Sequence, residues 1–376
     1  MDNLVIISRI TPLNWPWRTL KMKKSICFIR RSFRFDGGAE AAAASYIKCL
    51  ERVSDIRLIC ETWSGDLSKK TTSKVAKGGW SRGTKYEHFI TGALQIAATN
   101  GCLIHSHECT PGAHVLRLGD GLHSHWLDLR GTSNLWRRFD GFHRRKLRFE
   151  QEAITHPDLK FLICNSNFVK NSVIERYSVD PSKICVIRNV VTQPFKEFDP
   201  SCVQRLSRKL LFVGSGWERK GLSDAIKAFA LLPNEWTFDV VGTDKAINEY
   251  KKLAERIGVE NRIHFLGAFP VRPEVYAKST VMIHAALYEP FPNVAIEALS
   301  QGLPVVSSPN SGTSDFNKSQ GVWTVKKDPT ELASSILNAA SISEDRRCSF
   351  RKHILQFDLE YLEKELVTLY SSITNT

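Results

Sequence analysis

Short apolar runs alternate with amphipathic, helix-like stretches along most of the chain. Apolar runs bounded by turn-forming residues predict buried strands, and the longer stretches between them predict helices. In the first half, the predicted strands cover residues 25–29, 56–60, 114–118, 161–164 and 184–187. The helices predicted between them cover residues 39–51, 86–98, 136–153 and 167–177.

Residues 192–207 interrupt this alternation. They contain Pro194 and Pro200 and show no periodicity, so we interpret them as a linker. The alternation then restarts, with strands predicted at 210–215, 238–242, 263–267, 281–286 and 304–308. Helices are predicted at 223–231, 246–257, 273–277, 294–300 and 345–372.

Repeated alternation of strands and helices implies parallel sheets with right-handed crossovers. The predicted fold class is α/β, with two Rossmann-like, doubly wound domains facing each other across a cleft. We expect these domains at residues 25–195 and 208–345, and a C-terminal helix within 346–376 that packs back across the linker. Residues 1–24 fit no element, and we interpret them as an extension or a misassigned start. A short interfacial anchor carrying Trp15 and Trp17 is the alternative.

The net charge of +13 is concentrated in the first half. Residues 1–200 hold 31 Lys and Arg against 19 Asp and Glu, and residues 201–376 hold 21 against 20. The first half therefore suits a polyanionic partner such as nucleic acid, a phosphorylated glycolipid or an acidic membrane surface. The sequence shows neither base-stacking aromatics at a set spacing nor a zinc module, so we do not expect nucleic acid.

The nine cysteines are scattered and form no C-x-x-C pair. Several lie inside apolar runs, including Cys27, Cys60, Cys164 and Cys185. This pattern predicts buried free thiols in a reducing compartment, and it favours neither a disulfide framework nor a zinc site. No apolar run reaches the length of a membrane-spanning helix, and we predict no secretory signal.

The stretch EPFPNVAIEALSQGLPVV carries two glutamates eight residues apart, Glu289 and Glu297. The prolines delay a helix until Asn293, which we expect to be its N-cap, and Gly302 ends it. Glu297 then lies one turn inside an apolar helix, where an unpaired carboxylate is costly. Its partner is predicted to be either an internal Arg or Lys or the hydroxyls of a ligand.

A second candidate site follows the strand LLFVGS, where Gly214 precedes Arg219 and Lys220. A glycine turn between a strand and a helix is a usual place for phosphate in such sheets. The alternative is a solvated Arg–Lys pair at a helix start, but cations are unfavourable at that end of the helix dipole. We therefore favour a bound anion.

Three further features lie in the first half. Gly37 and Gly38 precede a predicted helix and allow a ligand to approach the backbone closely, although a plain tight turn fits equally well. Asp120 follows a strand and either orients a ligand or simply satisfies a turn. The helix predicted at 136–153 carries basic residues for an anionic acceptor or membrane surface, with a solvated face as the alternative: Arg137, Arg138, Arg144, Arg145, Lys146 and Arg148.

Together, the GGAE after the first strand, the VGS…ERKG and the spaced glutamates followed by GLPVV resemble the retaining glycosyltransferases of family 4, which have the GT-B fold. The stretches ETWSGD and PGAHVLRLGD are similar to the lipopolysaccharide-core glucosyltransferases within that family. The likeness runs through most of residues 25–330. It implies an acceptor-binding first domain and a second domain that binds a nucleotide sugar.

The resemblance also implies roles for residues. Glu297 would hold the ribose hydroxyls, and Glu289 would face the donor sugar. Arg219 and Lys220 would neutralise the leaving diphosphate, so that neither a metal nor a cofactor is needed. Asp120 would lie near the reacting centre. The remaining donor-binding residues would act through their backbone near the sugar and phosphates: Gly37, Gly38, Gly214, Phe291, Pro292, Asn293 and Val294.

The resemblance is incomplete at two places. The closest relatives carry an aspartate where this chain has Ala42, and Pro290 and Phe291 resemble the wider family, so the donor is a hexose or an N-acetylhexosamine. The implied activity is transfer of a hexose from a UDP-sugar, or a similar nucleotide sugar, to a phosphorylated lipid-linked saccharide such as the lipopolysaccharide core. The protein is then expected in the cytoplasm, peripherally bound to the anionic inner membrane. The alternatives are a nucleotide-sugar 2-epimerase of the same fold, a transferase for another polysaccharide or glycolipid, and a non-enzymatic saccharide-binding relative.

Overall fold

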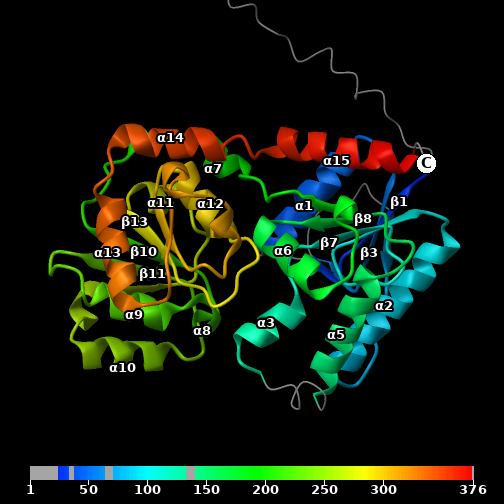
Figure 1. Ribbon diagram of the computed structural model, residues 1–376, viewed down its shortest axis with the longest axis horizontal. Coiled ribbons are helices and arrows are strands. Elements are labelled where there is room, and N and C mark those ends of the chain that lie inside the picture. Colours follow the sequence, from blue (N-terminus) through cyan, green and yellow to red (C-terminus); the bar gives the residue numbers. More distant parts are fainter. Residues whose placement is uncertain (1–23, 34–37, 64–70, 133–139, 375–376) are drawn as a thin grey trace, which may run out of the picture.

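The computed structural model describes residues 24–33, 38–63, 71–132 and 140–374. It contains two α/β lobes joined by the segment after residue 186 (Figure 1). Every strand pairing within the two large sheets is parallel, which confirms the predicted fold class. None of the described helices is both long and apolar enough to cross a membrane.

The first lobe contains a seven-stranded sheet in the order β5-β3-β1-β6-β7-β8-β9. Its strands are β1 (Ile26–Ile29), β3 (Ile56–Cys60), β5 (Thr71–Lys74), β6 (Leu103–Ser106), β7 (Val115–Leu118), β8 (Phe161–Cys164) and β9 (Ile184–Val186). Two short strands, β2 (Ser32–Phe33) and β4 (Thr62–Trp63), pair separately. Its helices are α1 (Gly38–Leu50), α2 (Arg82–Thr99), α3 (His123–Leu129), α5 (Gly141–Ile154) and α6 (Asn167–Arg176).

The second lobe contains a six-stranded sheet in the order β12-β11-β10-β13-β14-β15. Its strands are β10 (Lys209–Val213), β11 (Thr237–Val241), β12 (Ile263–Gly267), β13 (Val281–His284), β14 (Val305–Ser307) and β15 (Val322–Thr324). Its helices are α8 (Trp217–Lys220), α9 (Leu222–Phe229), α10 (Ile247–Ile257), α11 (Pro273–Ala277), α12 (Asn293–Ser300) and α13 (Pro329–Ala340). The predicted linker holds a short helix, α7 (Gln193–Glu197), and a 3₁₀ turn at Pro200–Cys202.

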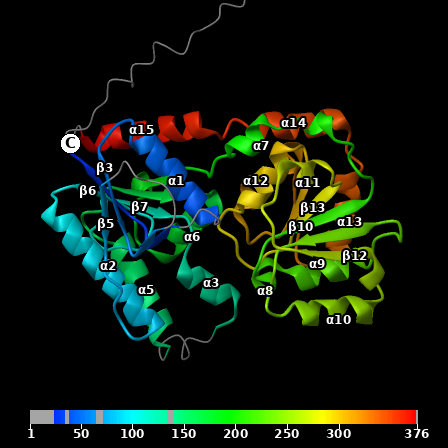
Figure 2. The same ribbon diagram turned by 180° about the vertical axis from the view of Figure 1, so that it is seen from behind.

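The C-terminal segment forms two helices and not the single helix predicted from residue 345. Helix α14 (Glu344–Ile354) packs on the second lobe, and α15 (Leu359–Thr374) lies beside α1 on the first (Figure 2). Leu362, Leu366 and Tyr370 join the apolar core of the first lobe. The chain therefore returns to the first lobe at its end. The bounds expected for the two domains stay a prediction.

Two predicted helices have different starts in the structure. Helix α2 begins at Arg82 because Ser81 forms a capping box with Thr84. The described part of the basic helix, α5, begins at Gly141, because Asp140 accepts hydrogen bonds from the backbone N–H groups of Phe142 and His143. Residues 133–139 lie outside the described part of the chain.

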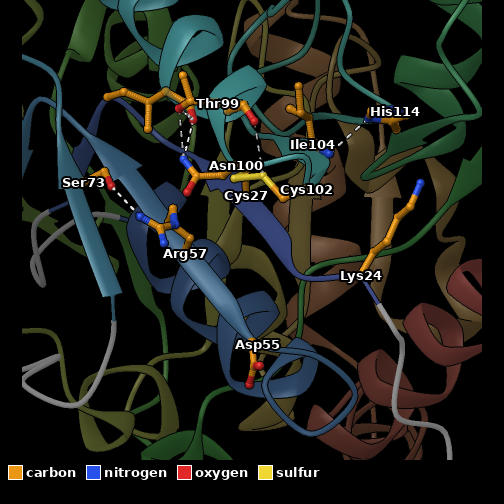
Figure 3. The surroundings of a disulfide bond; sticks show 12 residues. Lys24, Cys27, Asp55, Arg57, Ser73, Thr99, Asn100, Cys102, Ile104 and His114 are labelled. Atoms are coloured by element: carbon orange, nitrogen blue, oxygen red, sulfur yellow. Dashed lines mark hydrogen bonds between the residues drawn. A yellow bond between two sulfur atoms is a disulfide. The ribbon is translucent and has the colours of Figure 1, made fainter.

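The prediction of free thiols is wrong for Cys27. This residue, on β1, forms a disulfide with Cys102, which precedes β6 (Figure 3). Both strands are neighbours in the sheet, which brings the two residues together across 75 positions of sequence. Among the described cysteines, Cys49, Cys60 and Cys164 are buried free thiols, as predicted for the latter two.

Candidate active site

Strand β10 is followed by a glycine turn and a one-turn helix, and this helix carries the two expected cations. Gly214 has a φ of +140°, and a Cβ there would lie 2.6 Å from Cδ of Lys220. Arg219 and Lys220 do not lie at a helix start as expected. They occupy the last turn of the one-turn helix α8, where cations are favourable, and the left-handed Gly221 separates them from α9.

Glu289 lies beside these two cations, in the loop after β13. Its Oε2 accepts a 2.7 Å hydrogen bond from Nη1 of Arg219 and lies 3.5 Å from Nζ of Lys220. Burial alone would raise the pKa of Glu289, but Lys220 and Arg219 outweigh burial and lower the pKa to about 2. The three residues therefore form one charged cluster, a pairing that the sequence analysis did not predict.

Helix α12 carries the second glutamate. Oε2 of Glu297 accepts a 2.5 Å hydrogen bond from the hydroxyl of Tyr276 on α11. Within the described chain, Oε1 of Glu297 has no hydrogen-bond partner and the carboxylate has no ion pair. Burial raises the pKa of Glu297, although the Tyr276 hydrogen bond and Lys220 oppose this rise. Of the two predicted partners, an internal cation is therefore not the one observed.

The start of α12 differs from the expectation. Pro292, and not Asn293, is the N-cap, and Asn293 is the first helical residue. The Oδ1 of Asn293 accepts a 2.7 Å hydrogen bond from Asn189, which precedes the linker. The Phe291 side chain is buried, and its ring centroid lies 6.1 Å from that of Phe316. Only the backbone of Phe291 can therefore contact a ligand.

Sequence reasoning missed His284, the last residue of β13. Its ring is buried, and its Nε2 has no hydrogen-bond partner among the described residues. Burial and the nearby Lys220 lower the pKa of His284 to about 3, so the ring is neutral at physiological pH. The only signal in the sequence was a histidine inside an apolar strand, which is also typical of a satisfied core residue.

The first lobe contributes the loop between β7 and α3. Asp120 in this loop is 71% exposed and lies 3.5 Å from Nη1 of Arg30. Gly121 packs so closely on the second lobe that a Cβ would lie 2.1 Å from the Tyr288 hydroxyl. That hydroxyl accepts a 2.7 Å hydrogen bond from the backbone N–H of Leu122, so this contact joins the two lobes.

A cavity of about 550 Å³ lies between the lobes at this point. Its walls include Asp120 and Lys146 from the first lobe and Arg219, Glu289 and Pro290 from the second. Of the predicted site residues, the structure thus brings Asp120, Lys146, Arg219 and Glu289 together in one cleft. Gly38 begins α1, whereas Gly37 lies outside the described residues.

The basic residues of α5 do not form one shared face. Arg145 and Arg148 both pair with Glu87 on α2, and Arg144 is exposed. Lys146 points to the cleft, with its Nζ 3.9 Å from the centroid of the Tyr86 ring. Arg137 and Arg138 lie outside the described residues. The described part of the chain holds no cluster of three or more His, Cys, Asp or Glu suited to a metal ion.

Comparison with known families gives two matches that together cover most of the chain. The model of Glycosyltransferase Family 4 matches residues 36–192, and that of Glycosyl transferases group 1 matches residues 207–341. The chain is 33% identical over 124 residues to the lipopolysaccharide glucosyltransferase WaaG of Escherichia coli strain K12, which is 32% of this chain and 33% of the relative. It therefore spans about a third of that relative's length.

Two solved structures show the same fold. The crystal structure of WaaG, a glycosyltransferase involved in lipopolysaccharide biosynthesis, has a TM-score of 0.77 at 19% identity, covering 91% of this chain and 98% of WaaG. Anabaena Alr3699/HepE in complex with UDP and glucose has a TM-score of 0.69 at 20% identity, covering 93% of this chain and all of that one. These comparisons confirm the two-lobed GT-B fold expected from the resemblance.

Proposed function

The chain belongs to the family 4 and group 1 glycosyltransferases with the GT-B fold, and from this premise we propose that it is a retaining, metal-independent hexosyltransferase. Its donor is a nucleotide sugar such as a UDP-sugar, and its acceptor is a saccharide of the lipopolysaccharide core on a lipid anchor. The observation that carries the proposal is the Oε1 of the half-buried Glu297, which has no hydrogen-bond partner among the described residues, in a carboxylate that lies within the electrostatic influence of Lys220, a member of the Arg219–Lys220–Glu289 cluster.

Glu297 serves the ribose in this proposal. A carboxylate oxygen accepts hydrogen bonds from hydroxyls, and one ligand hydroxyl would complete what Tyr276 leaves open. The hydrogen bond from Tyr276 and the half-buried position fix this carboxylate, so Oε1 is held ready to accept a hydroxyl without a large reorganisation of the side chain. The donor therefore binds to the second lobe, since α11 and α12 both belong to it.

Arg219 and Lys220 serve the diphosphate. The side chain of Arg219 is 40% exposed and contacts Glu289 through Nη1 alone, so its other N–H groups remain for phosphate oxygens. The backbone N–H groups at the start of α12, from Asn293 onward, receive no side-chain cap and would bind the same anion. These fixed charges stabilise the departing diphosphate without a divalent metal.

The reaction follows from this placement. The bond between C1 of the hexose and the diphosphate oxygen breaks, and the acceptor oxygen bonds to C1 on the same face. The hydroxyl proton passes to the departing phosphate oxygen. Glu289 and Asp120 orient the sugar and the acceptor from the two sides of the cleft. Peripheral binding to the inner face of the membrane, through exposed basic residues such as Arg144, would deliver the acceptor.

The product decides between this function and its alternatives. The protein is incubated with UDP-glucose and purified lipid-linked core saccharide, and the new linkage is analysed by NMR. We expect a glycosidic bond with the anomeric configuration of the donor. An inverted linkage would contradict retention. An epimerised sugar nucleotide without transfer would show that the protein is an epimerase and not a transferase.

A further inference from the structure

Four cations line the first-lobe side of the cleft without a carboxylate partner. In the described parts of the chain, none of them forms an ion pair; each instead lies over an aromatic ring. The four are Arg82 over Phe142, Arg117 over Tyr46, Arg130 over Trp126 and Lys146 over Tyr86. Cation–π contacts stabilise such groups but leave their charge unneutralised.

The carboxylates of the same cleft are already engaged. Glu108 and Asp120 lie 3.6 and 3.5 Å from Nη1 of Arg30. Glu150 accepts hydrogen bonds from the backbone N–H groups of His123 and Ser124 and from the hydroxyl of Tyr177. Glu289 pairs with the second-lobe cations. None of these described carboxylates forms an ion pair with any of the four cations.

Arg117 is the deepest of the four. Its residue is 3% exposed, yet it lines the cavity. Its Nη2 donates a 2.6 Å hydrogen bond to Oδ1 of Asn189, and its Nε has no partner in the described chain. A Cβ on Gly119 would lie 2.0 Å from Nη1, so the guanidinium lies directly against the loop that carries Asp120. A buried charge paired only with a neutral amide is costly unless a ligand supplies the opposite charge.

His107 lies on the same floor of the cavity. Its ring is buried, and neither ring nitrogen has a hydrogen-bond partner among the described residues. Burial and the nearby Arg117 lower the pKa of His107 well below its usual value, so the ring is neutral and offers one donor and one acceptor. The floor thus holds unused hydrogen-bonding groups next to an uncompensated cation.

We propose that this part of the cleft is a subsite for an acidic group, phosphate or carboxylate, on the saccharide acceptor, with Arg117 as its counter-charge at the floor. Lys146, Arg82 and Arg130 line its walls and attract the anionic ligand. The inference rests on the proposed transferase function and specifies the chemical class of its acceptor. It also moves the expected acceptor contact from the outer face of the basic helix to the interior of the cleft.

The test uses the full chain saturated with UDP, so that the donor's diphosphate is already supplied. Glucose, glucose 6-phosphate and glucuronate are titrated by calorimetry. We expect at least one acidic sugar to bind about 10-fold or more tightly than glucose. Preference for glucose 6-phosphate assigns the subsite to phosphate, and preference for glucuronate assigns it to carboxylate. Equal binding of all three sugars would overturn the proposal.

Substitutions identify the residue responsible. Arg117→Met should weaken binding of the preferred acidic sugar by about 30-fold and leave glucose unchanged. Arg117→Lys keeps the charge but lacks the planar guanidinium, so it should weaken binding of the acidic sugar by only about 5-fold. The control is Lys160→Met, which removes an exposed charge just before β8, outside the cleft, and should change affinity less than about 2-fold.

The outcomes also separate this subsite from the proposed function. If Arg117→Met binds the acidic sugar as tightly as the wild type does, the subsite proposal is overturned, but the proposed transferase function is not. Failure of the wild-type protein to bind UDP would instead count against the transferase. If Arg117→Met does not fold, Arg117→Lys decides: unchanged affinity for both acidic sugars would contradict a direct contact with the guanidinium.

Discussion

The hydroxyl of Tyr276 donates a 2.5 Å hydrogen bond to Oε2 of Glu297, and this contact satisfies one of the two oxygens of a half-buried carboxylate on helix α12. Tyr276 is itself fully buried, so the pair is held rigidly between α11 and α12. The arrangement keeps one oxygen in place for a ligand without an internal ion pair, which would have to break on binding.

The first prediction concerns Tyr276→Phe. The substitution removes a hydrogen bond that lowers the pKa of Glu297, so the already raised pKa should rise further. If charged Glu297 binds the ribose, KM for the nucleotide sugar increases as pH falls, and this increase should begin at a higher pH in the variant. KM measured between about pH 5 and pH 8 checks this. An identical pH profile would show that Glu297 does not titrate in the donor site.

Glu289→Gln tests the charged cluster through acid stability. Because the pKa of Glu289 is lowered to about 2, its charge stabilises the fold above the usual carboxyl pKa, and this contribution is lost as pH falls toward 2. The variant should lose on the order of 3 kcal/mol at pH 7 and little near pH 2. Urea unfolding at several pH values measures the difference.

The control for Glu289 is Glu255→Gln on α10, since Glu255 is exposed and has no ion pair in the described chain. The free energy of unfolding should be unchanged by Glu255→Gln across the same pH range. A constant loss of stability in Glu289→Gln, independent of pH, would mean that the substitution acts through packing and that the cluster contributes no electrostatic stabilisation.

Two glycines that flank α8 form a matched pair. Gly216 and Gly221 have nearly equal positive φ, +73° and +74°, but a Cβ on Gly216 meets nothing within 4 Å, whereas one on Gly221 lies 1.9 Å from the carbonyl oxygen of Ala285. Gly216→Ala should lower the free energy of unfolding by about 1 kcal/mol, because an alanine is strained in this left-handed backbone conformation. Gly221→Ala should cost about 3 kcal/mol or more and displace Lys220.

Urea unfolding of both variants measures these costs, and donor KM reports the position of Lys220. Equal destabilisation by the two alanines would mean that the close approach of the α8 turn to β13 does not constrain the site. The comparison separates backbone strain from steric contact, because the strain is shared by both positions.

Much of the fold followed from local pattern, because each strand of a parallel sheet forms an apolar run that is visible in isolation. The strand β6 was missed because its residues, Leu103–Ser106, include a histidine and a serine that break the run. Likewise, β5 consists of Thr71–Lys74 and looks polar because it lies at the sheet edge. Strand–helix alternation nevertheless fixed the parallel topology.

Site residues could be named from sequence, but their partners could not. The pairing of Arg219 with Glu289 and the bond from Tyr276 to Glu297 join separate elements, and no local pattern encodes such contacts. The disulfide between Cys27 and Cys102 depends on the order of strands in the sheet, which sequence spacing does not reveal. Charge counting found the basic first half, but not that Arg145 and Arg148 share an ion pair with Glu87.

Membrane association gives a fourth prediction. Binding to anionic vesicles should weaken steeply as salt rises from about 0.05 M to about 0.3 M, because screening shortens the range of the attraction. Arg144→Glu, on an exposed residue, should weaken binding further, and a charge-reversed control at exposed Lys251 in the second lobe should not. Sedimentation with vesicles measures both effects. Salt-insensitive binding would contradict an electrostatic surface.

The most direct test of the account is the equilibrium binding of UDP-, GDP- and ADP-sugars to the wild-type protein and to Glu297→Ala, measured by calorimetry. We predict that wild type binds at least one of these nucleotide sugars and that Glu297→Ala weakens that binding by about 30-fold or more, since the ribose loses its charged hydrogen-bond acceptor. Binding of equal strength in both proteins, or no binding of any nucleotide sugar to wild type, would contradict the central claim.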